Sequence, residues 1–318
     1  MKYIYIIFFS LFLSTCCVCE DDYILRCEGF SETIEYNEDT INKKVLVIGV
    51  DGIRSDVVQE SISPFLFELS QSQDTYFTDS HIVEGNTYSG PNWSSILTGV
   101  HMYKHNVLGN DFNNPNFDEY PPFFYFLENI EYEINTVSLV NWLPIQTHIT
   151  ANYVDYGPEE SLSDIEVFNS CKEILINNNP VQGDVIFLQF DELDGAGHNY
   201  GFSADSEEYS NTLSVTDDYI EELYNIVQDK RTNGEDWLVL IVSDHGGDGT
   251  GHGDASNPHI NKTVFYANHP NLNFIDYHIS SMADLVPTIF SFLGIYSEQY
   301  QCKTDGVSLI EFVVQSDN

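Results

Sequence analysis

Three runs of apolar residues along the chain predict buried β-strands. The runs are continuous rather than alternating, which is typical of strands covered on both faces of a sheet. They read "KVLVIGV", "DVIFLQF" and "WLVLIVS", and they end at Val50, Phe190 and Ser243. An aspartate follows each run directly, at Asp51, Asp191 and Asp244.

Helical patterns lie between these runs. In "NTLSVTDDYIEELYNIVQDK", four apolar residues recur near one helix face: Leu213, Ile220, Leu223 and Val227. Strands that alternate with helices predict an α/β fold, a three-layer sandwich whose central, mainly parallel sheet is flanked by helices. Ligands of such folds bind beyond the carboxyl ends of the strands. We therefore expect the three aspartates to lie near a ligand site.

The first residues resemble a secretory signal peptide. Lys2 precedes an apolar run over residues 3–13, and small residues follow at 14–17. The run is shorter than the ~20 residues that span a bilayer, although a retained anchor is the alternative. We expect a signal peptide over residues 1–19 and one catalytic domain over 20–318. This predicts a protein that is secreted or in an endomembrane lumen, with no membrane span after cleavage.

An oxidising compartment gives the cysteines a structural meaning. After cleavage, Cys27, Cys171 and Cys302 remain. Cys171 lies on the apolar side of the helical pattern "SDIEVFNSCKEILI", which predicts a buried free thiol. Cys27 and Cys302 are then left as a hypothetical disulfide. The motif "NKT" at Asn261 is an N-glycosylation acceptor and predicts a glycoprotein with a surface loop there.

The charge balance excludes one class of partner. The chain has 11 Lys plus Arg against 50 Asp plus Glu, a formal net charge of -39. Nucleic-acid binding through a basic face is not expected, because that mode needs clustered positive charge. Most of the acids are expected on a solvated surface.

Two further motifs carry metal-ligand chemistry. "FDELDGAGHNYG" places Asp194 and His198 four positions apart, where one helical turn can aim both at a point. "VSDHGGDGTGHGD" joins Asp244 and His245 to a glycine-rich loop that leads to His252. With Asp51 these residues are three carboxylates and three imidazoles. The alternatives are an ordinary turn at Asp51 and an exposed loop with unused histidines.

Six such ligands suit a centre of two divalent metal ions for phosphoryl transfer, with positions left for substrate. The mixture of Asp and His favours zinc, whereas manganese or magnesium are alternatives. A hydroxyl beside such a pair becomes a nucleophile, and "TYSGPNWSSILTGV" offers Ser89 before a helical pattern. An ordinary helix N-cap is the other interpretation of Ser89, and the two are compatible, since helix N-termini also bind phosphoryl groups.

The motifs together resemble the alkaline phosphatase superfamily. "VIGVDGIRSD", "TYSGPNWSSILTGV…KHNVLGN", "DGAGHNYG", "VSDHGG…GHG" and "SSMADLVPTIFSFLGI" occur in the family's order. The similarity covers residues 44–309. It is greatest to the nucleotide pyrophosphatase/phosphodiesterase (type I phosphodiesterase) branch and its sulfatase-like relatives.

The resemblance implies roles for residues of this chain. One metal would be held by four residues, Asp51, Asp244, His245 and the nucleophile Ser89, and the other by Asp194, His198 and His252. Ser89 is favoured over Thr87 because it lies two positions before a Pro-Asn pair. Asn110 and the backbone N–H of Gly90 would bind phosphoryl oxygens.

The sequence also departs from the pattern. His252 is nearer to the Asp-His pair than in the phosphodiesterase branch, which leaves His259 and His278 as alternatives. Trp93 stands where formylglycine sulfatases need arginine, so that activity is not expected. Arg54 is the arginine near the motifs, and nothing suggests a bidentate clamp for a dianionic phosphate, which favours a diester.

The sequence therefore predicts a secreted metal-dependent hydrolase of small-molecule phosphate esters, with phosphodiester or pyrophosphate bonds preferred. A phosphomonoesterase or another phosphoryl or sulfuryl hydrolase of the superfamily is the runner-up, and a cation-binding glycoprotein without turnover is the alternative class. Lys104 is a candidate phosphate contact. Tyr88 and Trp93 are either stacking residues for an aromatic leaving group or ordinary packing residues.

Overall fold

The computed structural model describes residues 33–36, 40, 42–131, 133–275 and 278–311. The predicted signal peptide and Cys27 lie outside these residues. The strands are β1 (Ile34–Tyr36), β2 (Lys43–Val50), β3 (Thr75–Ile82), β4 (Thr136–Val140), β5 (Val185–Phe190), β6 (Asp236–Ser243), β7 (Lys262–Asn268) and β8 (Ile295–Ser297).

The α-helices are α2 (Pro64–Ser70), α3 (Ser89–Thr98), α4 (Met102–His105), α5 (Phe123–Glu128), α6 (Asp164–Leu175), α7 (Glu192–Tyr200), α8 (Glu207–Thr232), α9 (Leu285–Leu293) and α10 (Glu298–Lys303). Short turns of other helix types are η2 (Ser55–Val57), η3 (Ile145–Thr150) and η4 (Met282–Asp284). The predicted strands and helices all form within a few residues of their expected limits.

Six strands build the central sheet in the order β3-β7-β6-β2-β5-β4. β2 is parallel to β5 and β6, and β4 is parallel to β5. β7 is antiparallel to both of its neighbours, so it runs against the other strands of the sheet. The prediction of a mainly parallel sheet is confirmed. β1 and β8 pair separately as a small antiparallel ribbon.

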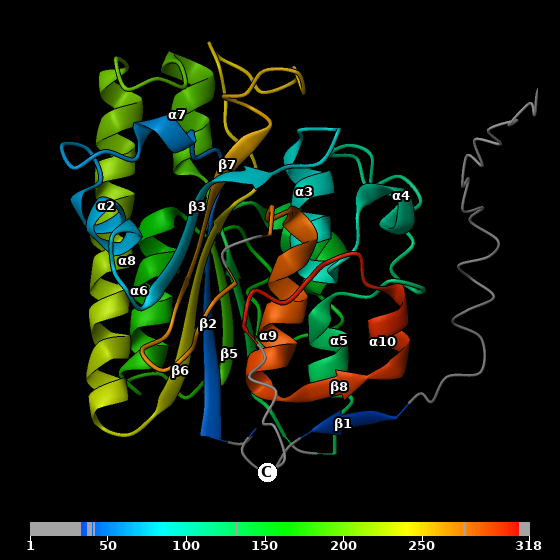
Figure 1. Ribbon diagram of the computed structural model, residues 1–318. Coiled ribbons are helices and arrows are strands. Elements are labelled where there is room, and N and C mark those ends of the chain that lie inside the picture. Colours follow the sequence, from blue (N-terminus) through cyan, green and yellow to red (C-terminus); the bar gives the residue numbers. More distant parts are fainter. Residues whose placement is uncertain (1–32, 37–39, 41, 132, 276–277, 312–318) are drawn as a thin grey trace, which may run out of the picture.

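Helices cover both faces of this sheet, as Figure 1 shows. On one face α2, α6 and α8 pack against side chains that include Leu46, Ile48 and Val50 of β2. On the other face α3, α5 and α9 pack against Val45 and Val47. Successive strand residues therefore enter opposite cores, which explains why the strands are apolar throughout. The predicted three-layer α/β sandwich is confirmed.

The cysteines agree with the prediction where they are described. Cys171 is a free, buried thiol on α6, packed beneath the sheet. Cys302 is disulfide-bonded. The pairing with Cys27 stays a prediction, because that residue lies outside the described part of the chain.

The glycosylation motif does not lie in an exposed loop. Asn261 is half-buried at the start of β7, its Nδ2 donates to the carbonyl of Ala255, and its Oδ1 is buried. Thr263 of the same motif is fully buried. Glycosylation of Asn261 stays a prediction. Among the described residues, no helix has the length and apolar character that crossing a membrane requires.

Candidate active site

The carboxyl ends of the central strands bring together the aspartates that the sequence singled out. Val50 of β2 is aligned with Phe190 of β5 and with Ser243 of β6. The next residue of β2 and β6 is Asp51 or Asp244, and both side chains are fully buried. The third aspartate, Asp191, begins the turn into α7.

Each carboxylate of the cluster has one oxygen fixed by the protein and one left free. Asp51 accepts hydrogen bonds at Oδ2 from the indole of Trp93, at 2.9 Å, and from Gln189, at 3.3 Å. Asp244 accepts at Oδ1 from backbone N–H groups. The other oxygens, Asp51 Oδ1 and Asp244 Oδ2, are buried without a hydrogen-bond partner, and so is Asp194 Oδ1. An orphaned buried carboxylate oxygen is costly unless a cation binds it.

The three histidines are oriented in one common way. The Nδ1 atoms of His245, His198 and His252 lie 2.8, 2.9 and 2.6 Å from the backbone oxygens of Gly246, Thr250 and Thr87. A carbonyl can only accept, so Nδ1 carries the proton and Nε2 is the ring atom left for a ligand. Metal-binding histidines are commonly held by such contacts.

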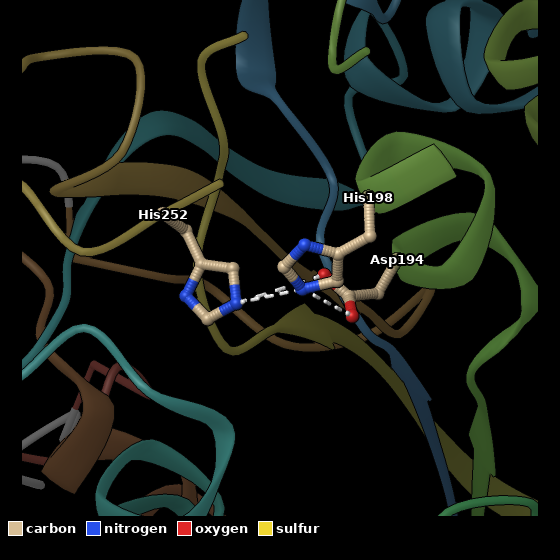
Figure 2. A group of neighbouring side chains, drawn as sticks. All are labelled: Asp194, His198 and His252. Atoms are coloured by element: carbon tan, nitrogen blue, oxygen red, sulfur yellow. Dashed lines mark hydrogen bonds and ion pairs between the residues drawn. The ribbon is translucent and has the colours of Figure 1, made fainter. Parts of the chain in front are cut away.

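The free atoms gather in two overlapping groups. In one, Asp194, His198 and His252 offer atoms within 4.8 Å of one another, and in the other Asp51, Asp194 and His245 do so. Figure 2 shows the first group, in which the two imidazole Nε2 atoms are 3.1 Å apart.

The structure does not divide the ligands into two separate sets, as the resemblance implied. Asp194, which the resemblance assigned to one metal, faces both groups. Asp244 reaches the second group through its Oδ2, which lies 3.4 Å from His245 Nε2. Three carboxylates and three imidazoles with free donor atoms fit divalent cations of the zinc type.

The electrostatics of the cluster favour added positive charge. Burial raises the pKa of Asp51 well above its usual range, and Asp244 and Asp194 raise it further. Burial and Asp194 likewise raise the pKa of Asp244. Burial lowers the pKa of His245 to about 3, so this imidazole is neutral. A hydrogen bond to Asp194 raises the pKa of His198 to about 9, so a cation here must displace a proton.

Ser89 lies at the edge of this cluster. It is the first residue of α3, and its Oγ is 3.4 Å from Nε2 of His245. Thr87, the less favoured candidate, is buried and its hydroxyl donates to the carbonyl of His252. The geometry therefore favours Ser89, whose side chain faces the ligands at the positive end of a helix dipole.

The predicted phosphoryl-binding pair is arranged differently from the expectation. The N–H of Gly90 donates to Asn110 Oδ1 at 2.8 Å, so in this structure it is used within the protein. The resemblance implies two donors to a phosphoryl oxygen, the N–H of Gly90 and the side chain of Asn110. Because the Gly90 N–H is already bonded, only the NH₂ group of Asn110 is left for that role. The approach is close, since a Cβ on residue 90 would lie 2.6 Å from the carbonyl oxygen of Gly109.

Several other candidates lie elsewhere. His259 is near Asp56, and His278 contacts Asp284 at 2.9 Å, so neither replaces His252. The two basic candidates have partners within the protein. Lys104 forms an ion pair with Asp305, and Arg54 forms one with Asp56 and donates to the carbonyl of Phe202. Trp93 is buried, and its indole N–H donates to Asp51. Tyr88 is exposed, and its ring forms a T-shaped pair with the imidazole of His252.

Sequence reasoning missed Gln189 and the supporting role of Trp93. Gln189 is fully buried on β5 and contacts Asp51. The available signal was a single amide inside the otherwise apolar run "VIFLQF".

The model of the type I phosphodiesterase / nucleotide pyrophosphatase family matches residues 45–129 and 161–264. The chain belongs to this family. The matched ranges contain Asp51, Ser89, Asn110 and the residues of the "DGAGH" and "SDHGG" motifs. The predicted family is confirmed, and a family of hydrolases that act on phosphate esters agrees with the predicted class of reaction.

Known proteins extend this result. A Bis(5'-adenosyl)-triphosphatase of Bos taurus is 26% identical over 224 residues, which are 64% of this chain and 47% of the relative. The chain thus spans about half the length of the curated relative it matches. Murine ectonucleotide pyrophosphatase/phosphodiesterase 5, in an inactive form with AMP, has a TM-score of 0.61 at 14% identity, covering 80% of this chain and 96% of that one.

A second solved structure is the zinc complex of the C-terminal periplasmic domain of EptC from Escherichia coli. Its TM-score is 0.57 at 14% identity, and the match covers 85% of this chain and 87% of that domain. These likenesses confirm the alkaline phosphatase-like fold.

Proposed function

We propose that the protein is a metal-dependent phosphodiesterase that uses Ser89 as its nucleophile. The observation that carries the proposal is a cluster of ligand atoms next to Ser89: three buried carboxylate oxygens without a hydrogen-bond partner, and three imidazole Nε2 atoms that face them. Asp51, Asp244, His245 and Ser89 would hold one divalent cation, and Asp194, His198 and His252 the other. Zinc is the cation that this mixture of ligands favours.

Two bound cations would lower the pKa of the Ser89 hydroxyl and stabilise charge on the entering and leaving oxygens. The chain itself supplies position. Ser89 lies at the start of α3, where the helix dipole favours an anionic phosphoryl group. Attack of Ser89 Oγ on phosphorus would expel the first alcohol and leave a phosphoserine diester, which water then cleaves. The Asn110 amide would donate to an equatorial oxygen, where charge grows in the transition state.

A diester is the preferred substrate because, in the described part of the chain, the lysine and the arginine nearest to the motifs already have carboxylate partners. Arg54 and Lys104, the basic residues nearest to the motifs, are bound to Asp56 and Asp305. A monoester dianion carries one more negative charge than a diester monoanion, so Asp51, Asp194 and Asp244 would repel it more strongly. The Bos taurus relative, named as a triphosphatase, supports pyrophosphate bonds as a further possibility within the same reaction type.

The proposed setting follows from the apolar N-terminal segment, which favours secretion or an endomembrane lumen. There the substrate is a small phosphate ester. Removal of the signal peptide would leave the catalytic domain from residue 20 onward.

The test is hydrolysis of p-nitrophenyl esters by the zinc-loaded protein. We expect bis-p-nitrophenyl phosphate to be cleaved faster than p-nitrophenyl phosphate, and EDTA to abolish both activities, with recovery on adding zinc. Equal or better turnover of the monoester would contradict the preference for diesters. Absence of turnover with either ester, in a protein shown to bind zinc, would favour the non-catalytic alternative.

A further inference from the structure

We propose that Gln189 is a positioning residue that decides which carboxylates reach the metal centre: it fixes Asp51 as a ligand and holds Asp191 away. The inference rests on the proposed function, because it concerns the arrangement of the proposed ligands. It adds a residue that the motifs do not contain.

Gln189 is an unusual residue for its place in the sheet. It occupies the last but one position of β5, pairs with Gly49 of β2 and Val140 of β4, and has no exposed surface. Burying a primary amide costs free energy unless its donors and acceptor are all paired. A packed apolar side chain would avoid that requirement, so the amide indicates a polar task at this position.

All polar atoms of the Gln189 side chain are engaged at the end of the sheet. Its Nε2 donates to Asp51 Oδ2 at 3.3 Å and to Asp191 Oδ1 at 3.2 Å. Its Oε1 accepts the backbone N–H of Trp142 at 2.9 Å. The two N–H bonds of one amide thus divide between two carboxylates from neighbouring strands.

The hydrogen bond to Asp51 determines which of its oxygens is free. Trp93 and Gln189 both donate to Oδ2, and Oδ1 is left without a partner, 3.3 Å from His245 Nε2. A carboxylate held on one side cannot rotate to exchange its oxygens, so the free oxygen keeps facing the site. Polar neighbours of this kind orient metal ligands and commonly change metal affinity ~10–100-fold.

The hydrogen bond to Asp191 restrains a competing carboxylate. Asp191 follows β5 just as Asp51 follows β2, in strands whose last residues, Phe190 and Val50, are paired. Asp191 also lies close enough to Asp194 for the two carboxylates to repel each other. Nothing in its residue type distinguishes it from a ligand, yet its side chain turns to Gln189 and belongs to neither ligand group.

The experiment compares zinc affinity in the full-length protein by competition with a chromophoric chelator. Gln189→Met keeps the volume of the side chain and removes its donors. We expect about a 10–100-fold loss of affinity at one of two zinc equivalents. Gln146→Met is the matched control, since Gln146 is also buried and its Oε1 accepts from Thr150. That control should keep zinc affinity within about threefold of the original protein.

A double variant tests the restraint of Asp191. In the original background, Asp191→Asn should leave zinc affinity unchanged or slightly lower, because a negative charge is lost. In the Gln189→Met background the same change should raise the affinity severalfold, because the released competitor is removed. A merely structural role of Gln189 would give Asp191→Asn the same effect in both backgrounds, which would overturn the restraint.

Folding is checked by circular dichroism in EDTA. If Gln189→Met does not fold, Gln189→Asn replaces it, because this amide is one methylene too short to reach both carboxylates. Zinc affinity equal to that of the original protein in a folded Gln189 variant would overturn the positioning role and leave the proposed function intact. Failure of the original protein to bind zinc would instead overturn the proposed function itself.

Discussion

Individual residues of the site leave specific atoms without partners. Asp51, Asp194 and Asp244 each present one buried oxygen that no donor of the described chain satisfies. In most folded proteins such atoms are paired, because an unpaired buried polar group costs roughly 1–3 kcal/mol and a charged one more. Two dications would satisfy all three oxygens at once and remove the repulsion between the carboxylates.

Replacement of the nucleophile separates chemistry from metal binding. We expect Ser89→Ala to lower kcat for bis-p-nitrophenyl phosphate by about three orders of magnitude or more, with zinc content unchanged, because imidazoles and carboxylates remain as ligands. Ser94→Ala on the same helix removes a hydroxyl that bonds the carbonyl of Gly90, and should change kcat by less than about tenfold. Unchanged turnover in Ser89→Ala would refute the assignment.

The pKa shifts give the pH dependence a sign. In the metal-free protein, burial raises the folded-state pKa of Asp51 and Asp244 above the value in the unfolded chain, so this contribution to stability is lost as the pH rises. The pKa of His245 is lowered to about 3, so its contribution to stability has the opposite sign. Stability increases with pH between about 3 and 6.5 and does not depend on His245 above that range. Between about pH 6.5 and pH 9 the folded protein loses the proton of His198, whose pKa the hydrogen bond to Asp194 raises to about 9, so this contribution to stability is lost there and fewer protons compete with zinc.

We therefore expect the rise in melting temperature on zinc binding to be larger at pH 8 than at pH 6.5. Scanning fluorimetry with and without EDTA measures both values. A zinc-induced rise that is equal at the two pH values would contradict the carboxylate cluster as the binding site.

The sequence indicates which residues are candidate ligands, but not which of their atoms face the site. Asp51, Asp244 and His245 could be predicted to lie together because they follow buried strands, and Asp194 and His198 because they have helical spacing. His252 lies in a glycine-rich loop, where only its residue type was a signal. The choice of Nε2 in the histidines depends on carbonyls from distant loops, such as Thr87 for His252. The contact between Gly90 and Asn110 likewise depends on the path of a loop, which local patterns do not determine.

At the scale of elements, the start of α7 is held by a carboxylate from α6. Asp164 is buried, and it accepts the N–H groups of Asp191 and Glu192, at 2.9 and 3.1 Å. It also accepts from the side chain of Asn141 at 2.8 Å. These bonds satisfy donors at the first turn of the helix that carries Asp194 and His198. The position of these two ligands therefore depends on α6.

A second buried aspartate caps the start of another helix, away from the site, and provides a control. Asp217 of α8 accepts the N–H groups of Phe65 and Leu66 at the start of α2, at 2.9 and 2.8 Å. Burial raises the pKa of Asp164 and of Asp217 to about 6, so both are ionised at pH 7.5.

We expect Asp164→Ala and Asp217→Ala to destabilise the protein by similar amounts, roughly 1–2 kcal/mol each, because each removes a helix cap. Only Asp164→Ala should also weaken zinc binding, since only α7 carries proposed ligands. Urea unfolding in EDTA measures the first effect and chelator competition the second. Equal loss of zinc affinity in both variants would show that the effect is general destabilisation.

Elements were predictable where apolar periodicity is strong. β2, β5, β6, α6 and α8 form where the sequence places them. The antiparallel direction of β7 was not predicted. The direction of a strand depends on the path of the loop before it, and the residues of the strand itself do not indicate it. The half-buried position of Asn261 has the same origin, since this residue directly precedes the reversed strand.

The whole molecule carries a formal charge of -39, and its basic side chains are largely occupied. Among the described residues, five lysines have a carboxylate partner: Lys44, Lys104, Lys172, Lys230 and Lys303. Arg231 donates instead to the carbonyls of Trp237 and Asn268. An anionic substrate therefore approaches through a repulsive field, and the bound cations act only at short range.

Salt should consequently help rather than hinder the reaction with an anionic substrate. Between 10 and 300 mM NaCl we expect kcat/KM for bis-p-nitrophenyl phosphate to rise by roughly two- to tenfold, because screening weakens repulsion during encounter. The zwitterionic p-nitrophenyl phosphorylcholine serves as the control and should change less. A fall in kcat/KM with salt for the anionic ester would contradict a net repulsive field.

The most direct test is anomalous X-ray diffraction from crystals of the zinc-loaded protein. We expect two zinc peaks at the carboxyl edge of the sheet, one in contact with Asp51, Asp244, His245 and Ser89 Oγ, and one with Asp194, His198 and His252. Zinc bound elsewhere, or a site in which Ser89 Oγ does not contact a zinc ion, would contradict the proposal that these residues activate a serine nucleophile.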